Sequence, residues 1–65
     1  MKYVYLSTNG VIKATYNNVS HLRTDEGLVK VKRAADVTEP EFKTFDPYVL
    51  VAVIRLGEGE RLVIA

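Results

Sequence analysis

Nine side chains of this sequence could transfer protons or hold a cation: eight carboxylates and a single histidine. Most of the carboxylates fall where turns or the start of a helix are expected, and acidic side chains there commonly bond to the local backbone. His21 has no serine or cysteine partner on a nucleophile turn. A catalytic site needs convergent groups in a pocket, so the chain is predicted not to be an enzyme. The carboxylates are Asp25, Glu26, Asp36, Glu39, Glu41, Asp46, Glu58 and Glu60.

Metal and cofactor sites have no support in the sequence. The chain has no cysteine and one histidine, which excludes thiolate ligands and multi-histidine sites within one chain. The segment Gly57-Glu58-Gly59-Glu60 is rich in glycine, but it matches neither the dinucleotide-binding fingerprint nor the P-loop. Its two glutamates would repel phosphate, so a turn is the better interpretation. We expect no cofactor and no metal.

Basic and aromatic residues suggest a third chemistry, the binding of nucleic acid. Small barrels hold single strands by combining a basic groove with exposed aromatic rings. The net charge is only +1, which is low for a dedicated nucleic-acid coat protein. The same residues also suit solvated strand edges and apolar packing, so nucleic-acid binding stands as the alternative function. The residues concerned are His21, Arg23, Lys30 and Lys32 on the basic side, and Tyr3, Tyr5 and Tyr16 on the aromatic side.

The elements that must position these side chains are mostly strands, because valine, tyrosine, isoleucine and threonine dominate runs of period two. The clearest is a hairpin in KYVYLST-NG-VIKATY, where Asn9-Gly10 predicts a two-residue type I′ turn. The predicted register sets Thr8 opposite Val11, Leu6 opposite Lys13, and Tyr3 opposite Tyr16. One face then carries Tyr3, Tyr5, Ile12, Ala14 and Tyr16, and the other carries Lys2, Val4, Leu6, Val11, Lys13 and Thr15.

A second hairpin is predicted in VSHLR-TDEG-LVKVKR, with residues 24–27 as its loop and Arg23 opposite Leu28. A slip of one residue would exchange its two faces, so the assignment depends on the length of that loop. The predicted inner face consists of Ser20, Leu22, Val29 and Val31. The predicted outer face consists of Val19, His21, Arg23, Leu28, Lys30 and Lys32.

A short helix is predicted over residues 39–45. Thr38 and Glu41 have the spacing of a capping box, and Val37 could meet Phe42 as a hydrophobic staple. The residue before Pro47 avoids the α region, which ends the helix there. Phe42 and Phe45 would then cover the sheet together.

The end of the chain, YVLVAVIRL-GEGE-RLVIA, predicts a last hairpin whose first strand is apolar on both faces. A continuous apolar run is typical of a strand covered on both sides. One short helix cannot cover two faces of a sheet, so either the sheet curls into a barrel or a second subunit covers it. We expect this hairpin to be a central pair that lies partly at a homo-oligomer interface. The candidate interface residues are Val49, Val51, Val53, Leu62 and Ile64.

These elements predict one domain over residues 1–65. The expected fold is mainly β: a small curled sheet or barrel, SH3-like or Sm-like in general shape, of five to six antiparallel strands with one short helix near 39–45. At 65 residues and 48% apolar content, oligomerisation is the available means of stabilisation. The expected function is therefore a non-catalytic binding or regulatory module that acts through protein–protein contacts, as a homo-oligomer with a further, unidentified protein target.

No membrane partner is expected. The longest apolar run is far below the roughly 20 residues that a membrane span needs, and the N-terminus lacks the apolar region of a signal peptide. With no cysteines, the expected location is cytoplasmic.

Overall fold

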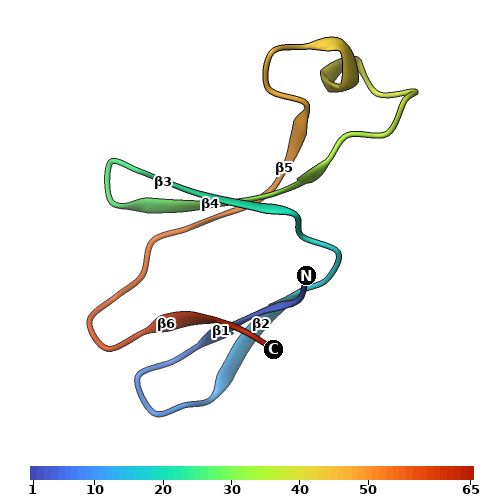
Figure 1. The fold of residues 1–65 in the computed structure, drawn as a ribbon. Coiled ribbons are helices and arrows are strands. Elements are labelled where there is room, and N and C mark those ends of the chain that lie inside the picture. Colours follow the sequence, from blue (N-terminus) through green and yellow to red (C-terminus); the bar gives the residue numbers. More distant parts are fainter.

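The computed structural model describes residues 1–65 as two antiparallel sheets of three strands each (Figure 1). The first sheet has the strand order β2-β1-β6 and the second has the order β3-β4-β5. The elements are β1 (Tyr3–Leu6), β2 (Ile12–Tyr16), β3 (His21–Asp25), β4 (Leu28–Ala34), a 3₁₀ helix η1 (Pro40–Lys43), β5 (Tyr48–Ile54) and β6 (Arg61–Ile64). The mainly β class and the strand number agree with the sequence-based expectation. A closed barrel does not form, because no strand of one sheet pairs with a strand of the other.

The first hairpin forms, but its turn differs from the predicted one. The amide of Gly10 donates to the carbonyl of Ser7, and Gly10 alone in this turn has a positive φ, of 82°. The loop is therefore a type I turn followed by glycine, which is the usual three-residue loop and not a type I′ turn. The Ser7 hydroxyl accepts a hydrogen bond from the Val11 amide at 3.1 Å. The loop therefore closes between Ser7 and Val11 and not, as predicted, between Thr8 and Val11.

The loop is one residue longer than predicted, and a bulge on β2 compensates for the extra residue. Tyr3 lies opposite Tyr16 as predicted, but Leu6 lies opposite Ile12, and Lys13 is the extra residue of β2. Because a bulge interrupts the alternation of side chains, Ile12 shares the face of Leu6 and leaves the predicted tyrosine face. Tyr3, Tyr5 and Tyr16 pack toward the second sheet.

The second hairpin has a two-residue turn in place of the predicted four-residue loop. Glu26 and Gly27 both have positive φ, 53° and 77°, as a type I′ turn requires. Arg23 consequently lies opposite Lys30, not Leu28. This change moves the register by two residues, so the predicted faces survive. Val19 and Ser20, which precede β3, are the exceptions. Val19 is expected on the outer face but is fully buried, and its amide donates to the Met1 carbonyl between the sheets. Ser20 is expected on the inner face but is exposed.

The predicted C-terminal hairpin does not exist. β5 pairs with β4, whereas β6 crosses to the other sheet and pairs with β1, with Val63 opposite Val4 (Figure 1). Each strand lies at an edge, so the expected central pair is wrong. The loop between them is bound to the first hairpin, because the Thr8 hydroxyl donates to the Glu58 carbonyl at 2.8 Å. That contact directs the chain away from β5.

The predicted helix over 39–45 is reduced to the single turn η1. Thr38 does not cap it. The residue at the N-cap position is Glu39, and its side chain makes no capping bond. The Glu39 carboxylate instead accepts a hydrogen bond from the Asp36 amide at 2.9 Å and binds Arg33. These bonds hold residues 36–39 in a turn directly before η1. Val37 and Phe45 are exposed, so neither the staple nor the predicted covering of the sheet is formed.

The core between the sheets is small. Four residues are buried, of which Val19, Val31 and Ile54 form one cluster and Val4 lies on the other side of β1. The radius of gyration is 12.9 Å, against about 11 Å expected for a compact chain of this length. The accessible surface is 4655 Å², against roughly 4,200 Å² for a typical monomer of this mass. The chain therefore leaves more surface open than its size requires.

Candidate interaction surface

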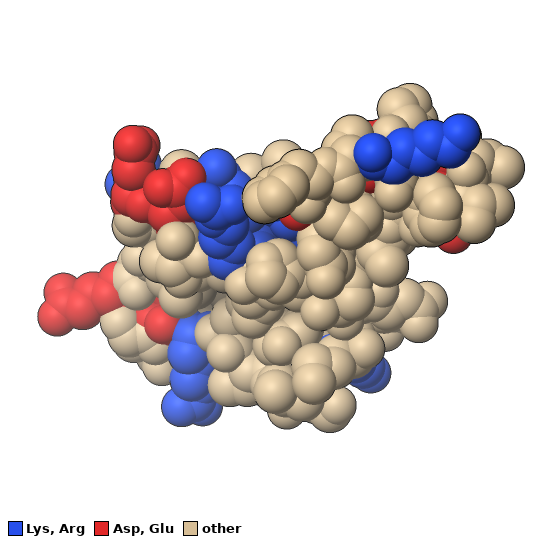
Figure 2. All heavy atoms as spheres, turned by 45° about the horizontal axis from the view of Figure 1, so that its top comes forward, with Lys and Arg blue, Asp and Glu red and all other residues tan.

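Large apolar side chains lie exposed on three parts of the molecule. They are Leu50, Val51 and Val53 on β5; Val37, Phe42 and Phe45 on the segment between β4 and β5; and Met1, Val11, Ile12 and Ile64 around the first sheet. Figure 2 shows that much of the visible surface carries neither acidic nor basic groups. Contiguous exposed apolar patches mark interaction sites on many soluble proteins.

The outer face of the second sheet turns away from the core and combines charged and apolar residues. Cross-strand pairing sets His21 opposite Lys32 and Arg23 opposite Lys30. On the other side of β4, Lys30 lies opposite Val53 and Lys32 opposite Leu50. The predicted basic residues are thus brought together on one face, where they border the apolar side chains of β5. We call this set the outer face: His21, Arg23, Lys30, Lys32, Tyr48, Leu50, Val51 and Val53.

Carboxylates neutralise half of the basic groups on the outer face. Lys30 binds Asp25 at 3.2 Å, and Lys32 binds Asp46 at 2.8 Å. The hydrogen bond from Lys32 is the main reason that the pKa of Asp46 lies below its ordinary value. The side chain of Lys32 is only 12% exposed, so it is poorly available to an external anion.

An aromatic contact joins the two edges of the same sheet. The rings of His21 on β3 and Tyr48 on β5 stack with their centroids 4.8 Å apart. His21 lies opposite Lys32 and Tyr48 lies opposite Ala34, so the two rings meet across β4. The stack holds His21 against the sheet.

The remaining predicted site residues are dispersed. Leu62 packs against the core cluster, and Val49 is partly buried opposite Arg33. Ile64 is exposed on β6, in the other sheet from Val51 and Val53. Tyr3, Tyr5 and Tyr16 also pack against the core cluster. The predicted interface set is therefore not one surface, and the three tyrosines do not lie beside the basic residues of the outer face.

Sequence reasoning missed the exposed segment of residues 35–47, which we call the arm. In Figure 1 the arm extends away from the two sheets beyond the start of β5. A bidentate ion pair holds the base of the arm. Arg33 Nη1 donates to Glu39 Oε1 at 2.6 Å, and Arg33 Nη2 donates to Glu39 Oε2 at 2.9 Å. This pairing lowers the pKa of Glu39 to about 2. The sequence signal is weak: Phe45 directly precedes Asp46-Pro47, where the predicted helix must end.

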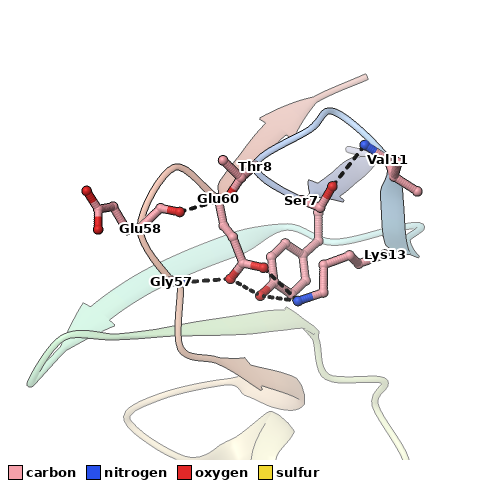
Figure 3. A network of polar contacts seen from close by, with 8 residues as sticks. Ser7, Thr8, Val11, Lys13, Gly57, Glu58 and Glu60 are labelled. Carbon is pink, nitrogen blue, oxygen red and sulfur yellow. Dashed lines mark hydrogen bonds and ion pairs between the residues drawn. The ribbon is translucent and has the colours of Figure 1, made fainter.

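A polar network connects the first hairpin to the loop before β6 (Figure 3). The Tyr5 hydroxyl donates to Glu60 Oε1 at 2.7 Å, and Lys13 Nζ donates to Glu60 Oε2 at 2.7 Å and to the Tyr5 oxygen at 3.2 Å. The Gly57 amide donates to the same carboxylate at 2.7 Å. These bonds, that from Lys13 first, lower the pKa of Glu60 to about 2. A carboxylate so fully bonded keeps the loop in place and has little capacity left for proton transfer.

The surface has no pocket, and no group of three His, Asp or Glu side chains is arranged to hold a metal ion. No helix has both the length and the apolar character needed to cross a membrane. No protein-family model, no curated protein and no solved structure matches the chain.

Proposed function

We propose that this protein is a small protein-binding module that acts as a homo-oligomer, with β5 at its self-association surface. The observation that carries this proposal is the balance of apolar side chains: ten large ones are exposed, whereas only four residues of the chain are buried. A domain of this size is marginally stable alone, and association is a common way to complete its core.

β5 is the part of the surface that best fits this role. Leu50, Val51 and Val53 are 52%, 45% and 49% exposed and lie within four consecutive positions of one strand. Covering the exposed half of each such side chain contributes about 1 kcal/mol. Three side chains from each of two copies would supply several kcal/mol at one contact.

A further protein target remains part of the proposal. The exposed Phe42 and Phe45 lie on the arm, outside β5. Aromatic side chains contribute strongly to binding at protein interfaces. The arm would therefore be available to a second protein after self-association.

Nucleic-acid binding is the second candidate function, and one observation favours it. His21, Arg23, Lys30 and Lys32 lie together on adjacent strands of the outer face. Two observations count against it: Lys30 and Lys32 are paired with carboxylates, and the three tyrosines pack toward the core. Protein contact is the better supported of the two functions.

The test of the proposed function is the mass of the protein in solution across a range of concentrations. A dimer or larger assembly supports self-association. A monomer at every concentration rejects it. An oligonucleotide titration under the same conditions separates the second candidate from the first.

A further inference from the structure

The four sheet edges of the chain are protected unequally. β2 has a bulge at Lys13, β3 carries His21, Arg23 and Asp25, and β6 has only four residues and begins at Arg61. Bulges, charges and short length are the usual devices that stop an edge from pairing with another chain. β5 has seven residues, Tyr-Val-Leu-Val-Ala-Val-Ile, and none of them is charged.

β5 shares one of these devices, a bulge at Val51, but it has neither a charged residue nor a short length. The register with β4 shifts there, so that Lys32 pairs with Leu50 while Val31 pairs with Ala52. The shift lets two consecutive side chains, Leu50 and Val51, share the outer face, in agreement with their exposure of 52% and 45%. Beyond the bulge Ala52 turns inward and Val53 outward.

This bulge makes the inward and outward pattern of residues 48–53 symmetric. From Tyr48 to Val53 the side chains point outward, inward, outward, outward, inward and outward. Opposite residues of an antiparallel pair have their side chains on the same face. When a strand pairs antiparallel with a copy of itself about a twofold axis, its order of inward and outward side chains must therefore be the same read from either end. β5 meets this condition about the bond between Leu50 and Val51.

The charges beyond the two ends of β5 fit the same register. Asp46 lies two residues before Tyr48, at a tight turn in which the Tyr48 amide donates to the Asp46 carbonyl at 2.8 Å. Pairing that sets Tyr48 opposite the partner's Val53 therefore brings Asp46 near the partner's Arg55, beyond the end of the strand ladder. Arg55 is exposed and makes no ion pair or side-chain hydrogen bond within its own chain. Asp46 is half exposed even though it binds Lys32. The symmetry generates this attraction twice in each dimer.

We propose that two copies of this chain pair their β5 strands antiparallel, with the twofold axis between Leu50 and Val51. The two three-stranded sheets then become one sheet of six strands. This inference rests on the proposed self-association and names its geometry. The backbone groups at the free edge of β5 gain partners, and Val53 of each copy is covered by Tyr48 of the other.

Hydrogen exchange on the wild-type protein tests the pairing directly. Within one chain, only those β5 amides that point toward β4 have a strand partner. At concentrations where the dimer is formed, the amides that point away from β4 are expected to exchange at least tenfold more slowly than after dilution to monomer. Association through side chains alone would leave their exchange unchanged, and that result would overturn strand pairing.

Charge reversal tests the register. Arg55→Glu sets a carboxylate against the partner's Asp46 at both ends of the pair, and we expect about tenfold weaker dimerisation. Arg61→Glu is the matched control, because Arg61 is an exposed arginine on β6 without an ion pair. Equal dimerisation by the two variants would overturn the register while self-association itself stands. A monomeric wild type would overturn both this inference and the proposed function.

Discussion

Glu60 and Lys13 are separated by 47 positions in the sequence, yet their side chains meet at 2.7 Å. Through this contact and the bond from Tyr5, the loop before β6 is bound to the first hairpin. The contact explains how a chain with two separate sheets holds its last strand against β1. It also makes the stability of the fold sensitive to acid.

The first prediction concerns that acid sensitivity. The pKa values of Glu39 and Glu60 fall from an ordinary 4.5 to about 2 in the folded chain. A carboxylate with a lowered folded pKa stabilises the fold fully above its unfolded pKa and loses that contribution as pH falls toward the folded one. We expect the free energy of unfolding to decline between about pH 4.5 and pH 2.

Glu60→Gln tests the assignment, because the amide cannot titrate. The variant is expected to be less stable than wild type at pH 7 and to show a shallower decline in acid, measured by urea unfolding at each pH. Glu58→Gln is the control, since Glu58 contributes only its backbone carbonyl to the network. A wild-type slope in the Glu60 variant would contradict the assignment.

The second prediction concerns the core. Val31→Ala removes two methyl groups from a fully buried site and should destabilise the fold by about 2 to 3 kcal/mol. Val37→Ala, at an exposed position of the arm, should change stability by less than about 0.5 kcal/mol. Equal effects of the two substitutions in denaturant unfolding would mean that the cluster between the sheets is not the core.

The third prediction concerns the turn between β3 and β4. Glu26 has a φ of 53°, a left-handed conformation that costs energy for most side chains. Asn-Gly is the preferred pair in a type I′ turn, so Glu26→Asn should stabilise the fold by roughly 0.5 to 1 kcal/mol. Glu58→Asn should give no gain, because Glu58 is not in the left-handed region. A thermal shift equal in both variants would contradict the turn assignment.

Much of this fold follows from local sequence, and the rest depends on contacts between distant residues. Asn9-Gly10 and the stretch ending at Gly27 correctly predict two hairpins, because a turn residue with positive φ acts within a few positions. The bulges at Lys13 and Val51 are not visible as sequence patterns, and they decide which side chains share a face. Gly57-Glu58-Gly59-Glu60 resembles a hairpin turn. The distant contacts that hold β6 and its loop at the other sheet are the pairing with β1 and the side chains of Thr8, Tyr5 and Lys13.

The candidate site was predictable to a similar degree. Period-two alternation correctly gathers His21, Arg23, Lys30 and Lys32 on one face. Alternation assigns side chains to faces but does not pair charges, so it could not reveal that Asp25 and Asp46 bind two of these basic residues. Apolar character groups Leu62 and Ile64 with Val51 and Val53, although they belong to another sheet.

The fourth prediction separates the two candidate functions. If the outer face binds nucleic acid, Lys30→Glu with Lys32→Glu should lower oligonucleotide affinity by about tenfold or more. Lys2→Glu with Lys43→Glu makes the same change in net charge away from this face. Equal affinity of the two double variants, measured by fluorescence anisotropy at fixed salt, would exclude the basic residues as a specific site.

The fifth prediction concerns the self-association surface. Val51→Lys should weaken assembly at least tenfold, because the interface would have to bury a charge. Val51 is 45% exposed in the single chain, so the lysine should leave the fold intact, as circular dichroism can verify. Val11→Lys changes an exposed valine outside β5 and should assemble like wild type. An assembled Val51→Lys variant would exclude β5 from the interface.

The central claim is that this chain associates with itself, and absolute mass by light scattering after size exclusion tests it most directly. At both low and high salt we expect at least twice the 7.3 kDa of one chain, because apolar contacts persist when charges are screened. A mass of 7.3 kDa at every concentration and at both salts would contradict the claim.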